Sequence, residues 1–211
     1  MNNIITIDGP SGAGKTSAAI LVADKLSLRY IPSGKLYRAV AYYVLQDRID
    51  INDPTAVASL LASLELDIDL RGHIISDGKD ISKALSASEI GIVSSIIAQN
   101  KKVRQRLTAI QRYIGKQYSC VIEGRSTAIE IFPEASLKIW LTANEAERLR
   151  RKAQAEGQEA AAVVSARDGI DKTRQLAPMQ KAEGAITIDS THLSVEQVAK
   201  QIIQIYHQLH V

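Results

Sequence analysis

A glycine-rich segment near the start of the chain constrains its fold more than any other feature. Residues Gly9–Thr16 read GPSGAGKT and match the pattern G-x-x-x-x-G-K-[ST] without a mismatch. The mainly apolar run Ile4–Asp8 before it predicts a buried strand, and Lys15–Leu26 after it carries apolar residues at helical spacing. In such a unit the backbone N–H groups of the loop face phosphate oxygens, and the helix N-terminus favours negative charge. The segment therefore predicts a binding site for a nucleoside triphosphate.

The individual positions of this loop predict how the triphosphate and its metal are held. Lys15 is expected to reach the β- and γ-phosphates, and the Thr16 hydroxyl is expected to ligate Mg²⁺. The expected nucleotide contacts are Gly9, Ser11, Gly12, Ala13, Gly14, Lys15, Thr16 and Ser17. The sequence lacks the N-K-x-D motif of GTPases and the L-S-G-G-Q segment of transport ATPases. Kinases of small molecules or nucleotides, with ATP as the donor, remain as the predicted class.

Alternating strand and helix patterns predict an α/β fold built on a doubly wound parallel sheet. The apolar runs Cys120–Ile122 and Leu137–Leu141 suit strands that are covered on both faces. Further strands are expected at 29–31 and 186–188, and helices at about 35–45, 87–99 and 103–117. Two more helices are expected to begin at the capping pairs Asn144/Glu147 and Ser194/Gln197.

One segment does not follow this alternation of strands and helices. Residues 66–78 alternate between apolar and polar across a turn at Arg71-Gly72, which predicts a small antiparallel hairpin within an insertion. We expect a single domain over residues 1–211. Its core is expected to comprise residues 1–32, 119–150 and 175–211, its inserted subdomain about residues 33–118, and a short helical lid about residues 151–174.

Composition limits the classes of ligand and partner that this chain is expected to bind. The net charge of +3 comes without any block of like charges, so it does not indicate nucleic acid, but it suits small anionic ligands. No apolar run approaches the ~18 residues of a membrane helix, and the N-terminus does not resemble a signal peptide. We therefore expect a cytoplasmic protein, a monomer, whose partners are small nucleotides rather than nucleic acid or membrane.

Arginines at the ends of predicted elements suggest how a second anion is bound. Transfer of a phosphoryl group between two anionic substrates needs cations that hold both and neutralise charge in the transition state. The candidates are Arg38, Arg104, Arg125, Arg151, Arg167 and Arg174. Arg125 directly follows a buried strand, at the edge of a parallel sheet where ligands bind. Residues 148–174 hold seven basic side chains against four acidic ones, divided by a polar stretch, which is typical of a lid with a mobile connection.

Taken in order, these segments resemble the bacterial type of cytidylate kinase (CMP/dCMP kinase), nearly from end to end. The resemblance covers IDGPSGAGKT, SGKLYRAVA, the hairpin that ends in SDGKDIS, SSIIAQNKKVR, VIEGR, FPEASLKIWLTA, ARDGIDKTR and AITIDST. It implies the nucleoside-monophosphate-kinase fold and transfer of the ATP γ-phosphoryl group to CMP or dCMP, with Mg²⁺. The inserted hairpin resembles that family's monophosphate-binding subdomain.

The resemblance also implies roles for single residues. The implied substrate contacts are Ser33, Gly34, Arg38, Ser95, Arg104, Arg125, Ser126, Arg167, Asp171 and Arg174. Within this set, Ser33, Arg38 and Arg125 would meet the acceptor base and phosphate, Ser95, Arg167 and Asp171 the sugar, and Arg104 and Arg174 the cytosine. The implied catalytic residues are Lys15, Arg125, Arg151 and Arg167, the last two approaching the transferred group from the lid.

Two departures from the family pattern leave the acceptor and the metal open. Ser126 stands where the family usually has an aspartate that accepts a hydrogen bond from the cytosine amino group. Pro32 stands where an acid helps to hold Mg²⁺, so Asp8 is expected to serve with Thr16. Two alternatives therefore remain: a kinase for UMP, a modified pyrimidine nucleotide or a non-nucleotide phosphate, or a nucleotide-binding sensor with weak turnover.

Overall fold

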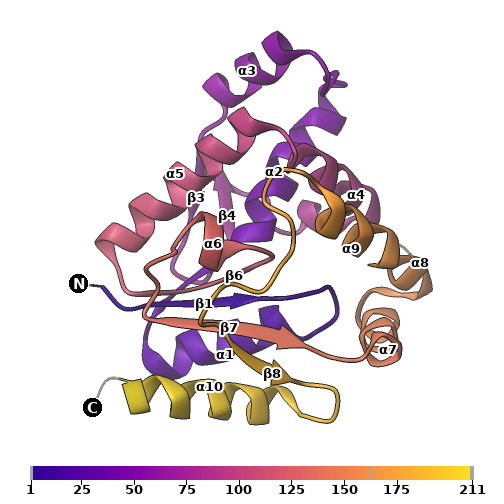
Figure 1. Ribbon diagram of the computed structural model, residues 1–211. Helices are drawn as coiled ribbons and strands as arrows, with labels where there is room; N and C mark the ends of the chain where they lie inside the picture. The colour runs from indigo at the N-terminus through magenta and orange to yellow at the C-terminus, as the bar shows by residue number, and fades with distance from the viewer. Residues whose placement is uncertain (1, 163, 210–211) are drawn as a thin grey trace.

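Five parallel strands form the centre of the computed structural model, which describes residues 2–162 and 164–209 (Figure 1). The strands are β1 Ile4–Asp8, β2 Arg29–Pro32, β6 Cys120–Gly124, β7 Leu137–Thr142 and β8 Ile186–Asp189. They lie in the order β2-β6-β1-β7-β8, and all neighbouring pairs run parallel. Every residue of β1 is buried. The parallel sheet predicted from the apolar runs is confirmed.

Helices cover both faces of this sheet. The helices outside the lid are α1 Lys15–Leu26, α2 Ser33–Gln46, α3 Pro54–Ser63, α4 Ser88–Ile97, α5 Lys101–Gln117, α6 Thr127–Glu130 and α10 Val195–Leu209. On the lower face in Figure 1, Ile7 of β1 shares a hydrophobic cluster with Val22 of α1. On the other face, Ile122 of β6 shares a second cluster with Leu36 of α2. The sheet is therefore doubly wound, as predicted.

The inserted hairpin is present and has one strand more than expected. Strands β3 (Leu66–Ile68) and β4 (Ile74–Ser76) pair antiparallel, and β5 (Lys79–Asp80) adds to β4, followed by the short helix η1 (Ala84–Ser86). The turn contains Gly72 with φ +78°, a conformation that glycine adopts without strain. A Cβ at Gly72 would come within 2.3 Å of the Tyr30 ring, so the turn packs tightly on β2.

Three helices follow β7 on the right of Figure 1: α7 (Glu145–Glu156), α8 (Gln158–Ala162) and α9 (Val164–Thr173). The predicted cap of α7 is confirmed, because the Asn144 side chain accepts a hydrogen bond from Glu147 N at 2.8 Å. The stretch expected as a mobile connection contains α8, since alanine, glutamine and glutamate favour helix. Gly157, with φ +92°, separates α7 from α8. Helix α9 then packs against α4 of the insertion.

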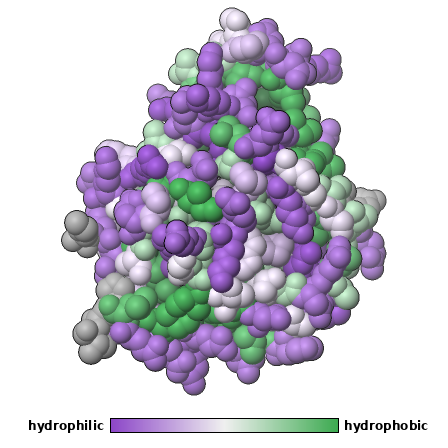
Figure 2. Space-filling model, viewed as in Figure 1, coloured by the Kyte–Doolittle hydropathy of each residue, from purple (hydrophilic) through white to green (hydrophobic). Residues whose placement is uncertain are grey.

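Polar side chains cover most of the surface seen in Figure 2. Apolar residues gather at its lower left, over the region that α1 and α10 occupy in Figure 1. Ile20 of α1 and Leu209 of α10 are 48% and 56% exposed. Across the residues that the structure describes, no helix has both the length and the apolar character needed to cross a membrane.

Candidate active site

A cavity of about 1170 Å³ opens at the carboxyl edge of the sheet. It is lined by the glycine-rich loop, the insertion, the β6–α6 junction, the lid helices and the segment between β8 and α10. The predicted residues that line it are Ser11, Gly12, Ala13, Gly14, Lys15, Thr16, Ser17, Ser33, Gly34, Arg38, Ser95, Arg104, Arg125, Ser126, Arg151, Arg167, Asp171 and Arg174. Gly9 and Asp8 do not line it. The structure thus gathers nearly all of the predicted site residues around one space.

Close packing explains the glycines of the phosphate-binding loop. Gly9, Gly12 and Gly14 all have positive φ, at 151°, 75° and 89°. A Cβ at Gly9 would lie 2.0 Å from the carbonyl oxygen of Leu141 in β7, and a Cβ at Gly12 would lie 2.5 Å from the carbonyl oxygen of Arg148 in α7. The loop therefore fits between β7 and α7 only because Gly9 and Gly12 lack side chains.

Lys15 is buried at the base of this loop, with 5% exposure. Its Nζ donates a hydrogen bond to the carbonyl oxygen of Pro10 at 2.7 Å. Burial, followed by repulsion from Arg125, lowers the pKa of Lys15 to about 7. A bound phosphate would favour the ammonium form again, because opposite charges nearby stabilise it. Binding of an anion would therefore favour protonation of Lys15.

The Asp8 carboxylate has a different role from the metal contact expected of it. It accepts hydrogen bonds from Thr127 N at 2.9 Å, Thr127 Oγ1 at 3.0 Å and Ala128 N at 2.8 Å. Burial raises the pKa of Asp8, and these hydrogen bonds oppose the shift. Asp8 therefore binds N–H groups at the start of α6, and its position does not support a metal contact.

Glu123 is the carboxylate that lies beside Thr16. The Thr16 hydroxyl donates to Glu123 Oε1 at 3.4 Å. In the sheet register, Glu123 of β6 lies between Pro32 of β2 and Ile7 of β1. Because successive side chains of a strand point to opposite faces, Asp8 faces away from the side on which Glu123 lies. Glu123 thus supplies an acid directly beside Pro32.

Arg125 is the central cation of the cavity. Its Nε donates to Asp171 Oδ2 at 2.9 Å, and its Nη1 donates to the carbonyl oxygen of Gly9 at 3.1 Å. Asp171 Oδ1 also accepts from Arg174 Nη1 at 3.2 Å. Burial opposes the charge of Arg125, but attraction by Asp171 and Asp168 outweighs it and raises the pKa. Helix α9 thereby fixes two predicted arginines through one carboxylate.

Arg167 and Arg38 approach each other over Gly91 of α4. A Cβ at Gly91 would lie 2.9 Å from Arg38 Nη2 and 3.2 Å from Arg167 Nη1, so a side chain at this position would displace one or both guanidinium groups. Burial, then repulsion from Arg125 and Arg38, lowers the pKa of Arg167 to about 10. Its buried Nε has no hydrogen-bond partner within the described part of the chain. These three guanidinium groups form a cationic centre that an anionic ligand would stabilise.

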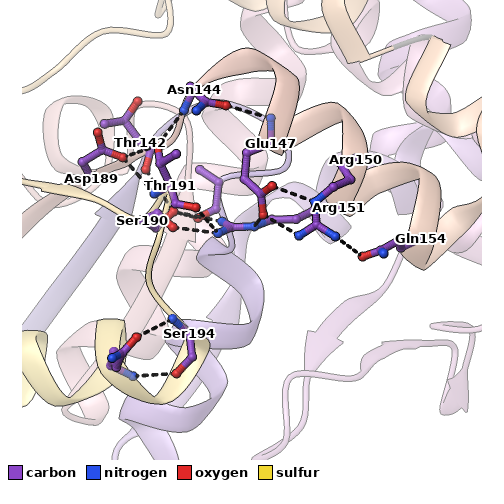
Figure 3. A network of polar contacts seen from close by, with 12 residues as sticks. Thr142, Asn144, Glu147, Arg150, Arg151, Gln154, Asp189, Ser190, Thr191 and Ser194 are labelled. Atoms are coloured by element: carbon purple, nitrogen blue, oxygen red, sulfur yellow. Dashed lines mark hydrogen bonds and ion pairs between the residues drawn. The ribbon is translucent and has the colours of Figure 1, made fainter.

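Arg151 lies in a polar network between α7 and the segment after β8 (Figure 3). Its Nε donates to Glu147 Oε1 at 2.8 Å, and its Nη1 donates to Ser190 Oγ at 3.0 Å. Ser190 Oγ in turn donates to the carbonyl oxygen of Ala13 in the phosphate-binding loop at 2.9 Å. Arg151 therefore joins the lid to the loop on the side away from the insertion.

The remaining predicted substrate residues lie on the insertion side. Arg104 is buried, donates to the carbonyl oxygen of Ala98 at 3.1 Å and lies over the Tyr37 ring at 5.6 Å. Ser95 is also buried, and its hydroxyl reaches the carbonyl oxygen of Gly91 at 3.5 Å. Ser126 precedes α6 and is 5% exposed. This side of the cavity thus combines cations, hydroxyl groups and an aromatic face.

The fold and this cavity define a class of protein. A glycine-rich loop between a strand and a helix, a buried lysine and arginines from both an insertion and a lid are the parts of a P-loop phosphotransferase. The profile of the cytidylate kinase family matches residues 5–208. The chain belongs to the cytidylate kinase family.

Individual relatives agree with this assignment. The cytidylate kinase of Geobacillus sp. (strain WCH70) is 36% identical over 220 residues, which cover 98% of this chain and 98% of that protein. The bifunctional pantoate ligase/cytidylate kinase of Synechocystis sp. is 38% identical over 218 residues, which cover 96% of this chain and 42% of that protein. The chain thus spans about two fifths of the length of such bifunctional relatives.

Solved structures share the fold at low identity. An uncharacterized protein from Eubacterium ventriosum has a TM-score of 0.53 at 14% identity, covering 98% of this chain and 99% of its own. The shikimate kinase of Bacteroides thetaiotaomicron has a TM-score of 0.50 at 13% identity, covering 99% of both chains. This likeness concerns the architecture alone.

Proposed function

We propose that this chain transfers the γ-phosphoryl group of ATP to CMP or dCMP, giving ADP and the diphosphate. The proposal rests on one observation: the phosphate-binding loop and the arginine group line the same cavity in a member of the cytidylate kinase family. The phosphate-binding loop with Lys15 would hold the donor, and Arg38, Arg125 and Arg167 would hold the acceptor phosphate and the group in transit. A coupled assay of ADP release with CMP, dCMP and UMP tests this, and turnover of none of them would refute it.

Positioning and electrostatics account for the chemistry in this proposal. The acceptor phosphate is already ionised, so no side chain need remove a proton from the nucleophile. Arg125 and Arg167 would bring the two phosphate groups together against their mutual repulsion, which the cationic centre offsets. We also propose that residues 151–174 form a lid, that about residues 33–118 form the inserted subdomain, and that the protein is a monomer.

The residues beside Lys15 fit a magnesium ion. The Thr16 hydroxyl and the Glu123 carboxylate approach within 3.4 Å, and hard oxygen ligands of this kind suit Mg²⁺, which usually keeps several waters. We propose that Thr16 binds the ion and that Glu123 holds its water shell, in the place expected of Asp8. The ion would supply neutralisation of the donor phosphates when bound.

Replacing Glu123 by glutamine is expected to raise the Mg²⁺ concentration for half-maximal activity by roughly 10- to 100-fold, as for other groups that hold a metal's outer sphere. The change removes the negative charge and keeps the size, so the sheet is preserved. The measurement is a magnesium titration of turnover at saturating nucleotides.

Asp8→Asn is the matched control, because it changes the acid one position further along the neighbouring strand. This variant should lower the free energy of unfolding by about 1–3 kcal/mol through the lost bonds to α6. Its magnesium requirement should match that of the wild type. If Asp8→Asn needed more Mg²⁺ for half-maximal activity than Glu123→Gln, the result would indicate that Asp8 rather than Glu123 helps to hold the ion.

A second candidate, a kinase with a broader choice of pyrimidine, is favoured by the position of Ser126. Ser126 lines the cavity, and the carboxylate of Asp171, which also lines it, is already held by Arg125 and Arg174. A hydroxyl can donate as well as accept a hydrogen bond, so it suits either the amino group of cytosine or the carbonyl of uracil.

Ser126→Asp is therefore expected to raise the ratio of kcat/KM for CMP over UMP by about tenfold or more, because a carboxylate accepts but does not donate. The ratio is measured with both nucleotides in the same assay. Ser63→Asp, at an exposed position that does not line the cavity, serves as a charge control. An unchanged ratio in Ser126→Asp would exclude Ser126 as the residue that selects the base.

A further inference from the structure

Both backbone polar groups of Ser11, in the phosphate-binding loop, are held by side chains of helices α7 and α9. Ser11 N donates to Asp168 Oδ1 at 3.0 Å, and the Ser11 carbonyl oxygen accepts from Arg148 Nη1 at 2.8 Å. Arg148 Nη1 also pairs with Asp168 Oδ2 at 2.5 Å. The three contacts close a ring that joins the backbone N–H and carbonyl groups of one loop residue to an ion pair. We call this ring the Ser11 latch.

The two charged members of the latch come from different helices. Arg148 belongs to α7 and Asp168 to α9, and their side chains are 9% and 5% exposed. The backbone of Arg148 already abuts Gly12, so α7 cannot move far without disturbing the loop. The latch therefore holds α9 against α7, which is itself packed on the loop.

Helix α9 needs such a contact because it carries a repelled cation. Arg167 directly precedes Asp168 and lies close to Arg38 and Arg125, which disfavour its charge. Asp168 Oδ1 is also 3.9 Å from Arg125 Nη2. One carboxylate thus attracts α9 to the loop, to α7 and to Arg125, and these attractions offset the repulsion that would push Arg167 out.

We propose that Asp168 is a positioning residue that, with Arg148, latches α9 onto the phosphate-binding loop and so keeps Arg167 beside Arg125. The kinetic part of the proposal rests on the proposed function. Asp168 touches neither substrate in this scheme and acts through the residues that it holds. A buried charge pair of this kind costs much when one partner is lost, because the other charge stays buried.

The first test is a kinetic cycle of Asp168→Asn, Arg148→Met and the double variant. Each single change is expected to lower kcat about 100-fold, as small misplacements of a reacting group do. The KM for CMP should change by less than about threefold, because Arg38 and Arg125 still hold the acceptor phosphate in the ground state. Because the two residues act as a unit, the kcat of the double variant should lie within about threefold of the lower of the two single-variant kcat values.

Ser165→Ala is the matched control. Ser165 Oγ also bridges α9 to α7, by a bond to Glu145 Oε1 at 3.0 Å, but it is exposed and does not touch the loop. Its kcat should stay within about twofold of the wild type, as for surface changes generally. A decrease in the kcat of Ser165→Ala equal to that of Asp168→Asn would overturn the proposal. A kcat in the double variant that is lowered by the product of the two single-variant factors would also overturn it.

The second test does not require turnover. Amide hydrogen exchange of Ser11 in the nucleotide-free protein should be about tenfold faster in Asp168→Asn and unchanged in Ser165→Ala, because exchange follows local opening. An unchanged rate in Asp168→Asn refutes the latch even if CMP is a substrate. If the wild type turns over no monophosphate, the proposed function fails and the exchange rates still decide the latch. Arg148→Lys, which keeps the charge and loses the fork, replaces any variant that does not fold.

Discussion

Replacing Lys15 by methionine is expected to lower turnover by about 1,000-fold or more, because the donor phosphates lose the cation that neutralises charge as the γ-phosphoryl group moves. Methionine keeps much of the length and apolar body of the buried side chain, so the fold should survive. The measurement is kcat at saturating ATP and CMP, with thermal unfolding as a check on the fold. Lys25→Met, at an exposed position on the same helix, should retain wild-type activity.

The pKa of Lys15 adds a second readout to this variant. Burial lowers the pKa of Lys15 to about 7, so at about pH 8 the lysine is largely neutral before phosphate binds. Bound phosphate raises that pKa, and ATP binding at about pH 8 should therefore take up a proton, whereas binding at about pH 6 should not. Affinity for ATP accordingly falls as the pH rises above 7. Calorimetry in two buffers of different ionisation enthalpy measures the uptake, and its persistence in Lys15→Met would assign the proton to another group.

Replacing Arg125 by methionine is expected to lower kcat/KM for the monophosphate by about 1,000-fold, in the range seen when an arginine that stabilises a transferred phosphoryl group is lost. The variant removes the central cation and leaves Asp171 with Arg174 alone. It also removes the contact to the carbonyl oxygen of Gly9. The effect should appear in both kcat and KM, because this arginine would hold the acceptor before and during transfer.

Two comparisons make the Arg125 prediction specific. Arg106→Met, at an exposed position of α5, controls for loss of one positive charge and should leave kinetics unchanged. ATP affinity of Arg125→Met should fall much less than kcat/KM for CMP, because Lys15 and the loop remain. Equal losses on the donor and acceptor sides would instead mean that Arg125 maintains the shape of the loop through Gly9.

The sheet and the loop were predictable because their signals are local. The bounds of β1 and α1 agree with the sequence prediction, and the cap at Asn144 was visible from residue type alone. Helix α3 had an unused signal: Asp53 caps it through Thr55 N at 2.8 Å, directly before Pro54. Strand β5 had none, because its two exposed polar residues are defined only by their pairing with β4.

The site was predictable as a set of cations but not as a set of contacts. All six predicted arginines line the cavity, although only Arg125 directly follows a strand of the sheet. The proposed assignment of the metal contact to Glu123 in place of Asp8 depends on strand register and on the face to which each side chain points, which the sequence does not specify. The role of Asp168 depends on how α9 docks, although its spacing of three from Asp171 already places both carboxylates on one helix face.

The strand order has a consequence for synthesis of this protein on the ribosome. Ile5 at the centre of β1 pairs with Val121 on one side and Leu137 on the other, so the first strand to be made waits for the whole insertion before it gains any neighbour. At 5–20 residues per second, the 116 residues that follow Ile5 up to and including Val121 take roughly 6 to 23 s to be made. During that time a strand that is buried at every position in the native state stays open to other nascent chains. The yield of folded enzyme is therefore expected to depend on chaperone supply more than on native stability.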